Sequence, residues 1–225
     1  MRNIFPDFIQ QNLHPETIFI IGGGPSIQSY DLTQLQHPDY FIITCNQAFQ
    51  LLPHSKISHH SDYSWWQKYH QRLEMDFKGQ IITGCGLGSN LTYPDSVIKL
   101  NTIQFHTREQ LFKSPSYVYG NNCGLQTVSL AHLFIPKNIV LIGFDFKSEN
   151  NQSHGYIQDQ QNNIKSYEKF WTLFLKDFQR FEQRRHQIWH EINPDYPLPK
   201  IWNINPNSAL TLYDQTARLD DFISI

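Results

Sequence analysis

A glycine-rich turn follows the first apolar run of the chain and has residue types suited to holding a phosphate group. After residues 17–21 the chain continues with Gly22, Gly23, Gly24, Pro25 and Ser26. Glycines let a ligand approach the backbone N–H groups, and proline followed by serine suits a helix start, where anions are favoured. The turn lacks both the G-x-G-x-x-G pattern and the Walker lysine, so a tight turn without a ligand is the alternative.

Polar residues also follow two later apolar runs. Asn46 and Gln47 come directly after the run at 40–44, and Asp145 lies at the end of the run at 138–144. In an open α/β sheet, ligands bind outside the carboxyl ends of the strands. These side chains and the glycine turn are therefore expected to meet in one crevice.

Two further segments have residues suited to ligand contact at the start of a helix. Asp62 follows a short strand-like run that contains His59 and His60, and it is either a helix cap or a ligand contact. Neighbouring histidines on a strand point to opposite faces, which argues against a shared metal ion. Asn122 and Gly124 begin another helix, where free N–H groups would hold an anion or a ribose hydroxyl, or the segment is only a capped loop.

A histidine in the polar stretch after residue 146 is the candidate general base. His154 stands beside a glycine, and histidine is the side chain best suited to accept a proton near neutral pH. An exposed loop histidine without a catalytic role is the alternative. Cys123 has no base assigned to it by the sequence, so it is not predicted to be catalytic.

The order of apolar runs and helical segments predicts the fold class. β-type runs at 17–21, 40–44, 80–83, 97–100, 138–144 and 200–204 alternate with polar or helical segments. This order indicates an α/β, Rossmann-like fold with a mostly parallel sheet and helices on both faces. Apolar residues at helical spacing predict helices over 124–134 and 164–192, the second long and amphipathic. We expect one domain, 1–225, with 147–199 forming a lid or helical region within it.

Composition limits the class of protein. The net charge of -2 and the pI of 6.6 give no strong nucleic-acid signal. Three widely spaced cysteines favour a reducing compartment and no structural zinc. No signal peptide or membrane-length apolar run is present in the sequence, so a cytoplasmic protein without a membrane span is expected.

In their order and spacing, these motifs resemble bacterial glycosyltransferase family 42, the CMP-sialic-acid-dependent sialyltransferases. The motifs run from the glycine turn to the segment Asn205-Pro206-Asn207-Ser208. The resemblance implies that the turn residues Gly22, Gly24, Pro25 and Ser26 surround the donor phosphate and ribose. It further implies that Asn46 and Gln47 contact the nucleotide or sugar, that Asn122 and Gly124 contact the nucleotide, and that His154 is the general base. Asn207 and Ser208 match a turn of the family, and the family also implies a homo-oligomer.

The sequence departs from this family at two positions. Where the family has tyrosines that bind the departing phosphate, this chain has Val140 and Lys147. Lys147 would neutralise the phosphate electrostatically, whereas Val140 cannot donate a hydrogen bond. The element from Asp62 to Trp66 resembles instead phage and prophage proteins related to the pterin pyrophosphokinase-like family, which share the nucleotide-binding core.

The sequence leaves three functions open. The first is single-displacement transfer of a sugar from a nucleotide-sugar donor, for which a CMP-linked sugar is the first candidate, to a hydroxyl acceptor of unknown identity, with no cofactor required. The second is a magnesium-dependent phosphoryl or pyrophosphoryl transferase in which Asp62 and Asp145 hold the metal. The third is a phage-derived assembly protein that binds nucleotides without catalysis.

Overall fold

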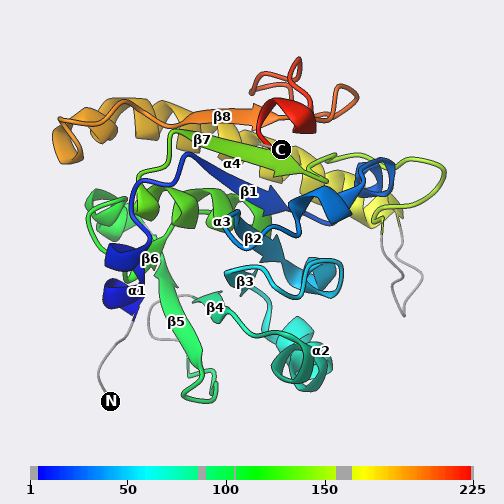
Figure 1. The fold of residues 1–225 in the computed structure, drawn as a ribbon, viewed down its shortest axis with the longest axis horizontal. Helices are drawn as coiled ribbons and strands as arrows, with labels where there is room; N and C mark the ends of the chain where they lie inside the picture. Colours follow the sequence, from blue (N-terminus) through cyan, green and yellow to red (C-terminus); the bar gives the residue numbers. More distant parts are fainter. Residues whose placement is uncertain (1–4, 86–89, 104, 156–163, 224–225) are drawn as a thin grey trace.

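The chain folds around a single parallel β-sheet. A computed structural model describes residues 5–85, 90–103, 105–155 and 164–223 (Figure 1). Its sheet has eight strands in the order β6-β5-β4-β3-β2-β1-β7-β8, and all neighbours are parallel. The strands are β1 Thr17–Ile21, β2 Phe41–Cys45, β3 Ile57–His60, β4 Gln80–Cys85, β5 Val97–Thr102, β6 Tyr117–Val118, β7 Asn138–Ile142 and β8 Lys200–Asn203.

Helices connect the strands. The α-helices are α1 Phe5–Gln11, α2 Tyr63–Asp76, α3 Cys123–Ala131 and α4 Ile164–Ile192. Shorter 3-10 helices span Pro25–Ser29, Leu32–Leu35, Asn46–Gln50, Phe105–Gln110, His132–Phe134 and Leu219–Asp221. This arrangement confirms the predicted parallel α/β fold and the long helix over 164–192.

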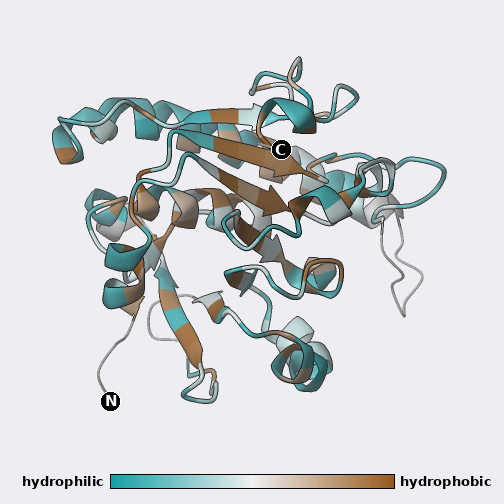
Figure 2. Cartoon of the chain, in the orientation of Figure 1, coloured by the Kyte–Doolittle hydropathy of each residue, from teal (hydrophilic) through white to brown (hydrophobic). Residues whose placement is uncertain are grey.

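The core lies on both faces of the central strands, where Figure 2 shows the most hydrophobic stretches of the sheet. On β1, Ile18 and Ile20 pack toward α1, α3 and α4, whereas Phe19 and Ile21 pack toward the 3-10 helices and the C-terminal segment. All four side chains are fully buried. A strand covered on both faces needs a continuous apolar run, which is why the sequence identified β1 and β7.

Several elements differ from the sequence predictions. β7 ends at Ile142, two residues earlier than predicted, because Gly143 has a φ of 73° and turns the chain. β6 and α1 were not predicted, and both are short. A two-residue strand and a seven-residue helix carry too little periodicity to be recognised.

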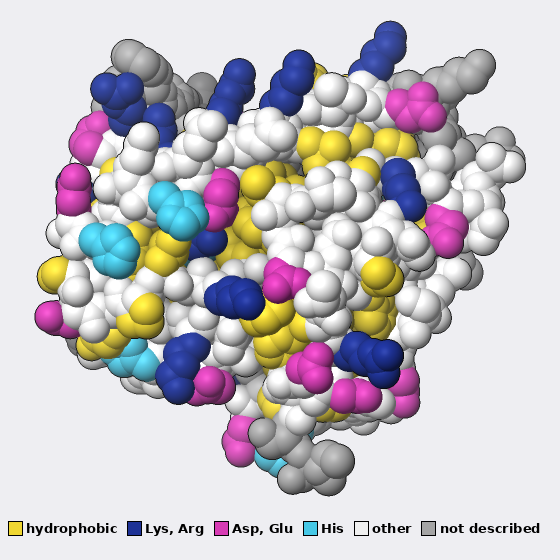
Figure 3. Space-filling model, turned by 90° about the horizontal axis from the view of Figure 1, so that it is seen from above, with side chains coloured by type: hydrophobic (Ala, Val, Ile, Leu, Met, Phe, Trp, Pro, Cys, Tyr) yellow, Lys and Arg dark blue, Asp and Glu magenta, His cyan; other side chains and the backbone are white. Residues whose placement is uncertain are grey.

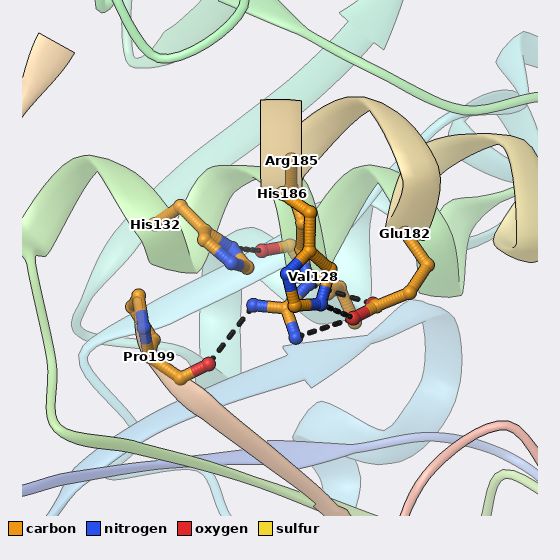
Figure 4. Close-up of polar contacts among 6 residues, drawn as sticks. All are labelled: Val128, His132, Glu182, Arg185, His186 and Pro199. Carbon is orange, nitrogen blue, oxygen red and sulfur yellow. Dashed lines mark hydrogen bonds and ion pairs between the residues drawn. The ribbon is translucent and has the colours of Figure 1, made fainter. Parts of the chain in front are cut away.

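A buried ion pair anchors α4 against the sheet (Figure 4). Arg185 is 5% exposed and holds Glu182 through Nε at 2.6 Å, while its Nη1 donates to the carbonyl of Pro199 at 2.9 Å. Beside it, His132 at the end of α3 has Nδ1 2.7 Å from the carbonyl oxygen of Val128. Of these contacts, the hydrogen bond from Arg185 to Pro199 joins α4 to the segment that leads into β8.

Within the described residues, none of the helices combines the length and the apolarity needed to cross a bilayer.

Candidate functional site

A pocket of about 330 Å³ lies at the carboxyl ends of the central strands. It brings together many of the residues that the sequence selected: Gly22, Gly23, Gly24, Asn46, Asp62, Asn122, Gly124, Asp145 and His154. Residues from six separate segments therefore share one cavity, as expected at the carboxyl edge of a parallel sheet.

The glycine turn continues β1 alongside the end of β7. Gly22 N–H donates to the Ile142 carbonyl at 2.7 Å, and Gly24 N–H donates to the Gly143 carbonyl at 2.8 Å. Gly155 N–H donates to the Gly23 carbonyl at 2.9 Å, which places the loop that carries His154, here called the histidine loop, directly against the turn. The glycine turn and the histidine loop are thus one structural unit.

A buried carboxylate ties this unit together. Asp145 is 2% exposed and accepts hydrogen bonds from Ser26 N–H at 3.1 Å, Ser26 Oγ at 2.8 Å and Asn205 Nδ2 at 3.0 Å. Burial raises the pKa of Asp145, while the hydrogen bonds from Ser26 oppose that rise. Ser26 is therefore engaged with Asp145 rather than aimed at the pocket.

Asn46 lines the pocket in an unusual backbone conformation. Its φ is 50°, in the left-handed region that asparagine tolerates better than most residues. Its Oδ1 is buried and has no hydrogen-bond partner within the part of the chain that the structure describes. A buried acceptor without a partner is costly, so this atom is suited to an N–H or O–H group of a ligand.

The loop before α3 is held from two sides. Asn122 Oδ1 caps α3 by accepting from Leu125 N–H at 3.0 Å, and its Nδ2 donates to Asn121 Oδ1 at 3.0 Å. From α4, Asp177 accepts hydrogen bonds from Asn121 N–H at 3.1 Å and from the Tyr119 hydroxyl at 3.0 Å. Both asparagines line the pocket in this fixed arrangement.

Removing the cap on α3 tests its contribution to stability. Asn122→Ala is expected to lower the free energy of unfolding by about 1 kcal/mol, because Leu125 N–H loses its acceptor. Asn122→Ser should recover most of that loss, since serine is an equally good cap. Urea denaturation measures both, and equal losses for the two variants would contradict a capping role.

Asp62 is the helix cap that the sequence offered as one alternative, and its ligand contact stays a prediction. Its Oδ1 caps α2 by accepting from Ser64 N–H at 3.0 Å, and the residue also lines the pocket. The two tryptophans that follow have different partners. Trp66 is buried, and Trp65 Nε1 donates to the side chain of Gln47 at 2.8 Å.

His154 lies in the wall of the pocket, and the pKa of its imidazole is shifted. Burial lowers its pKa to about 4, so the imidazole is neutral at pH 7. Its Nδ1 is 2.9 Å from Ser153 Oγ, and its ring centre is 5.5 Å from that of Tyr167. When Nδ1–H donates to the serine, Nε2 keeps the lone pair that a general base needs.

An aromatic wall from α4 completes the pocket, and the sequence did not identify it. Tyr167, Trp171 and Phe174 line the cavity at helical spacing. The sequence showed this aromatic face but not which part of it would meet the site. Ser61, Asn121 and Ser153 are further lining residues that sequence motifs did not select.

The remaining predicted residues lie outside this cavity. Gln47 is buried against Trp65, and Lys147 is partly buried, two residues beyond Asp145. Pro25, Ser26 and Asn207 line a neighbouring pocket of about 380 Å³, whereas Ser208 Oγ donates to the Phe144 carbonyl at 2.6 Å. Their binding roles stay predictions.

The acidic residues of the magnesium hypothesis share the pocket. Asp62 and Asp145 both line it, yet each already accepts hydrogen bonds from the protein. Within the described ranges no group of three or more His, Cys, Asp and Glu side chains is placed to hold a metal ion.

Fold and pocket together define a Rossmann-like α/β protein with a ligand cavity at the carboxyl edge of its sheet. One structure similar to it is the sialyltransferase CstII from Campylobacter jejuni in complex with the substrate analogue cytidine-5'-monophosphate. It is 18% identical with a TM-score of 0.48, over 91% of this chain and 86% of that one. Another is the MAf glycosyltransferase from Magnetospirillum magneticum AMB-1.

This second structure is 14% identical with a TM-score of 0.50, and the match covers 86% of this chain but only 32% of the other. The chain therefore corresponds to about a third of that protein's length. No protein-family model and no curated protein matches the sequence. At these identities the similarity is one of fold.

Proposed function

We propose that the protein is a glycosyltransferase that moves a sugar from a nucleotide-sugar donor to a hydroxyl acceptor in a single displacement. The observation that carries this proposal is the shared pocket, which unites a glycine turn, an unpartnered asparagine acceptor and a neutral histidine. The order of the motifs, which resembles the CMP-sialic-acid-dependent enzymes, supports a CMP-linked donor as the first to test.

Each group has a defined task in this reaction. The backbone of the glycine turn approaches the donor phosphate, and Asn46 Oδ1 accepts a hydrogen bond from the ribose or the base. His154 Nε2 takes the proton of the acceptor hydroxyl as its oxygen attacks the sugar carbon. The bond from that carbon to the phosphate oxygen breaks, and the nucleotide leaves with the electron pair. A nucleoside phosphate needs little acid assistance, so a metal ion is not required.

Replacement of the proposed base tests the function directly. His154→Asn is expected to lower kcat by about 100-fold or more, since general bases typically contribute 10²–10⁴-fold. The binding of CMP should change little, because the histidine acts on the acceptor. Assays of product formation and donor hydrolysis with CMP- and UDP-sugars measure kcat. Calorimetry with CMP measures nucleotide binding. A variant with the parental rate on every donor would remove His154 from the mechanism.

The pH profile of the parental enzyme is a second readout of the same histidine. With the pKa of the free enzyme lowered to about 4, kcat/KM should rise with pH through about 4 and then level off. An exposed histidine would place that rise near 6.5 instead. Because acid is also expected to unfold the chain, tryptophan fluorescence is recorded at each pH, and rates are compared only where the protein is still folded.

The alternative functions are tested by the same preparations. Activity that is abolished by a chelator and that prefers ATP would select the magnesium-dependent phosphoryl transferase. No thermal stabilisation by any nucleotide, together with a large particle in light scattering, would select the assembly protein. Light scattering also tests the homo-oligomer that the family resemblance implies.

A further inference from the structure

A row of basic side chains runs along the outward side of α4. Lys169, Lys176 and Arg180 are all exposed, and at about 100° per residue they lie within roughly 40° of arc. They span about 16 Å along the helix axis, at 1.5 Å per residue. Figure 3 shows several Lys and Arg side chains that project along its upper margin.

This row is not neutralised by neighbouring acids. Between Lys169 and Arg180 the only acidic residue on the helix is Asp177, which is buried and holds Tyr119 and Asn121. None of the three basic residues forms an ion pair within the part of the chain that the structure describes. The three cations are therefore exposed and form no ion pair among the described residues, although Glu168 stands beside Lys169 in the sequence.

Two large apolar side chains are exposed beside the basic row. Phe170 is 50% exposed and Leu173 is 54% exposed, and they are three residues apart on the same helix. On the wheel, Leu173 lies about 20° beyond Arg180, and Phe170 lies about 60° further round, so the two apolar side chains flank one side of the basic row. Cations around exposed apolar groups are the pattern of a helix that rests on an anionic bilayer surface.

We propose that this side of α4, formed by Lys169, Phe170, Leu173, Lys176 and Arg180, binds the surface of an anionic lipid bilayer. The cations would pair with lipid headgroups, and the two apolar side chains would enter the interface. A second copy of the chain is the poorer occupant, because a two-fold contact through this surface would set its cations against one another. Tyr167 and Trp171, which line the pocket, lie on the opposite side of the same helix, so the proposed surface and the pocket use different faces of α4.

Vesicle binding of the full chain tests this proposal without any assumption about catalysis. We expect co-sedimentation with phosphatidylcholine vesicles that contain 30% phosphatidylglycerol, little with phosphatidylcholine alone, and loss of binding as salt rises. Each Lys or Arg near an anionic surface contributes about five-fold in affinity, so Lys176→Glu with Arg180→Glu should weaken binding by about 30-fold or more. Phe170→Ser with Leu173→Ser should also weaken it.

Matched variants on another helix serve as controls. Lys68→Glu with Arg72→Glu makes the same charge change on α2, and Met75→Ser removes a side chain that is 69% exposed there. Both controls should bind vesicles like the parent, and thermal unfolding should show all variants folded. No binding to anionic vesicles, or equal loss in the α2 variants, would overturn the proposal. The proposal is also overturned if the protein binds short DNA duplexes through these cations and Phe170→Ser with Leu173→Ser leaves vesicle binding unchanged.

Discussion

Gly24→Ala is expected to destabilise the protein by about 3 kcal/mol, which is unusually large for the addition of one methyl group. The new Cβ would overlap the carboxylate of Asp145 and lie 2.8 Å from the Gly143 carbonyl oxygen. Neither neighbour can move freely. The carboxylate is held by Ser26 and Asn205, and the carbonyl accepts the Gly24 N–H.

The conformation of the backbone at this glycine is not the cause. Gly24 has φ of -66° and ψ of 157°, which alanine adopts without strain. The predicted loss therefore arises from close packing against a buried acid. For a chain of this size, thermal denaturation should show a fall in Tm of about 6–12 °C.

A double variant separates this cause from a general effect on the turn. Asp145→Ala removes the carboxylate that the new methyl group would meet, so adding Gly24→Ala to it should cost much less than in the parent. Urea denaturation of the four proteins gives the coupling energy. Additive losses would show that Asp145 does not limit the space at Gly24. CMP binding by Gly24→Ala should also weaken, since the turn must shift.

Acid is expected to destabilise the protein steeply below pH 6.5, because three histidines are buried in the neutral form. Burial lowers the pKa of His59 to about 4 and those of His60 and His132 to about 3. His59 adds to the shift of His60 by charge repulsion, and Arg185 adds to that of His132 (Figure 4).

The sign of the change in stability with pH follows from which state of the chain takes up protons. Between pH 6.5 and about 4 the unfolded chain binds a proton at each of these histidines, whereas the folded chain does not. Stability is therefore greatest above pH 6.5 and falls as the pH is lowered. Each histidine contributes about 1.4 kcal/mol per pH unit once its unfolded form is protonated. His154, with its pKa lowered to about 4, is a fourth such group, so the four together give about 5 kcal/mol per unit near pH 5.

Urea denaturation at pH 7.5, 6 and 5 measures this slope. His132→Phe keeps an aromatic ring where the imidazole stacks on Phe112, and it should reduce the slope by about a quarter. His37→Gln changes a side chain that is 62% exposed, and it should leave the slope unchanged. A parental slope in His132→Phe would exclude this histidine as a source of the acid sensitivity.

The sequence alone determined the sheet and the main helices. β1 and the long helix were predicted with the bounds that the structure has, because a strand buried on both faces and an amphipathic helix both require a distinctive apolar pattern. It also determined that the glycine turn, Asn46, Asn122, Asp145 and His154 meet in one place. That prediction followed from parallel strand order, which brings the carboxyl ends together.

Only the tertiary structure decided the direction of each side chain at that edge. Asn46 and Gln47 are neighbours in sequence, yet the first keeps a buried oxygen at the pocket and the second is bound to Trp65. Likewise, the aromatic residues of α4 became a pocket wall because Phe178, Phe181 and Trp189 of the same helix are buried in the core, which sets the side of the helix that faces the protein. Hydrophobic periodicity specifies which residues are buried, whereas contacts between distant segments specify what each buried or half-buried residue faces.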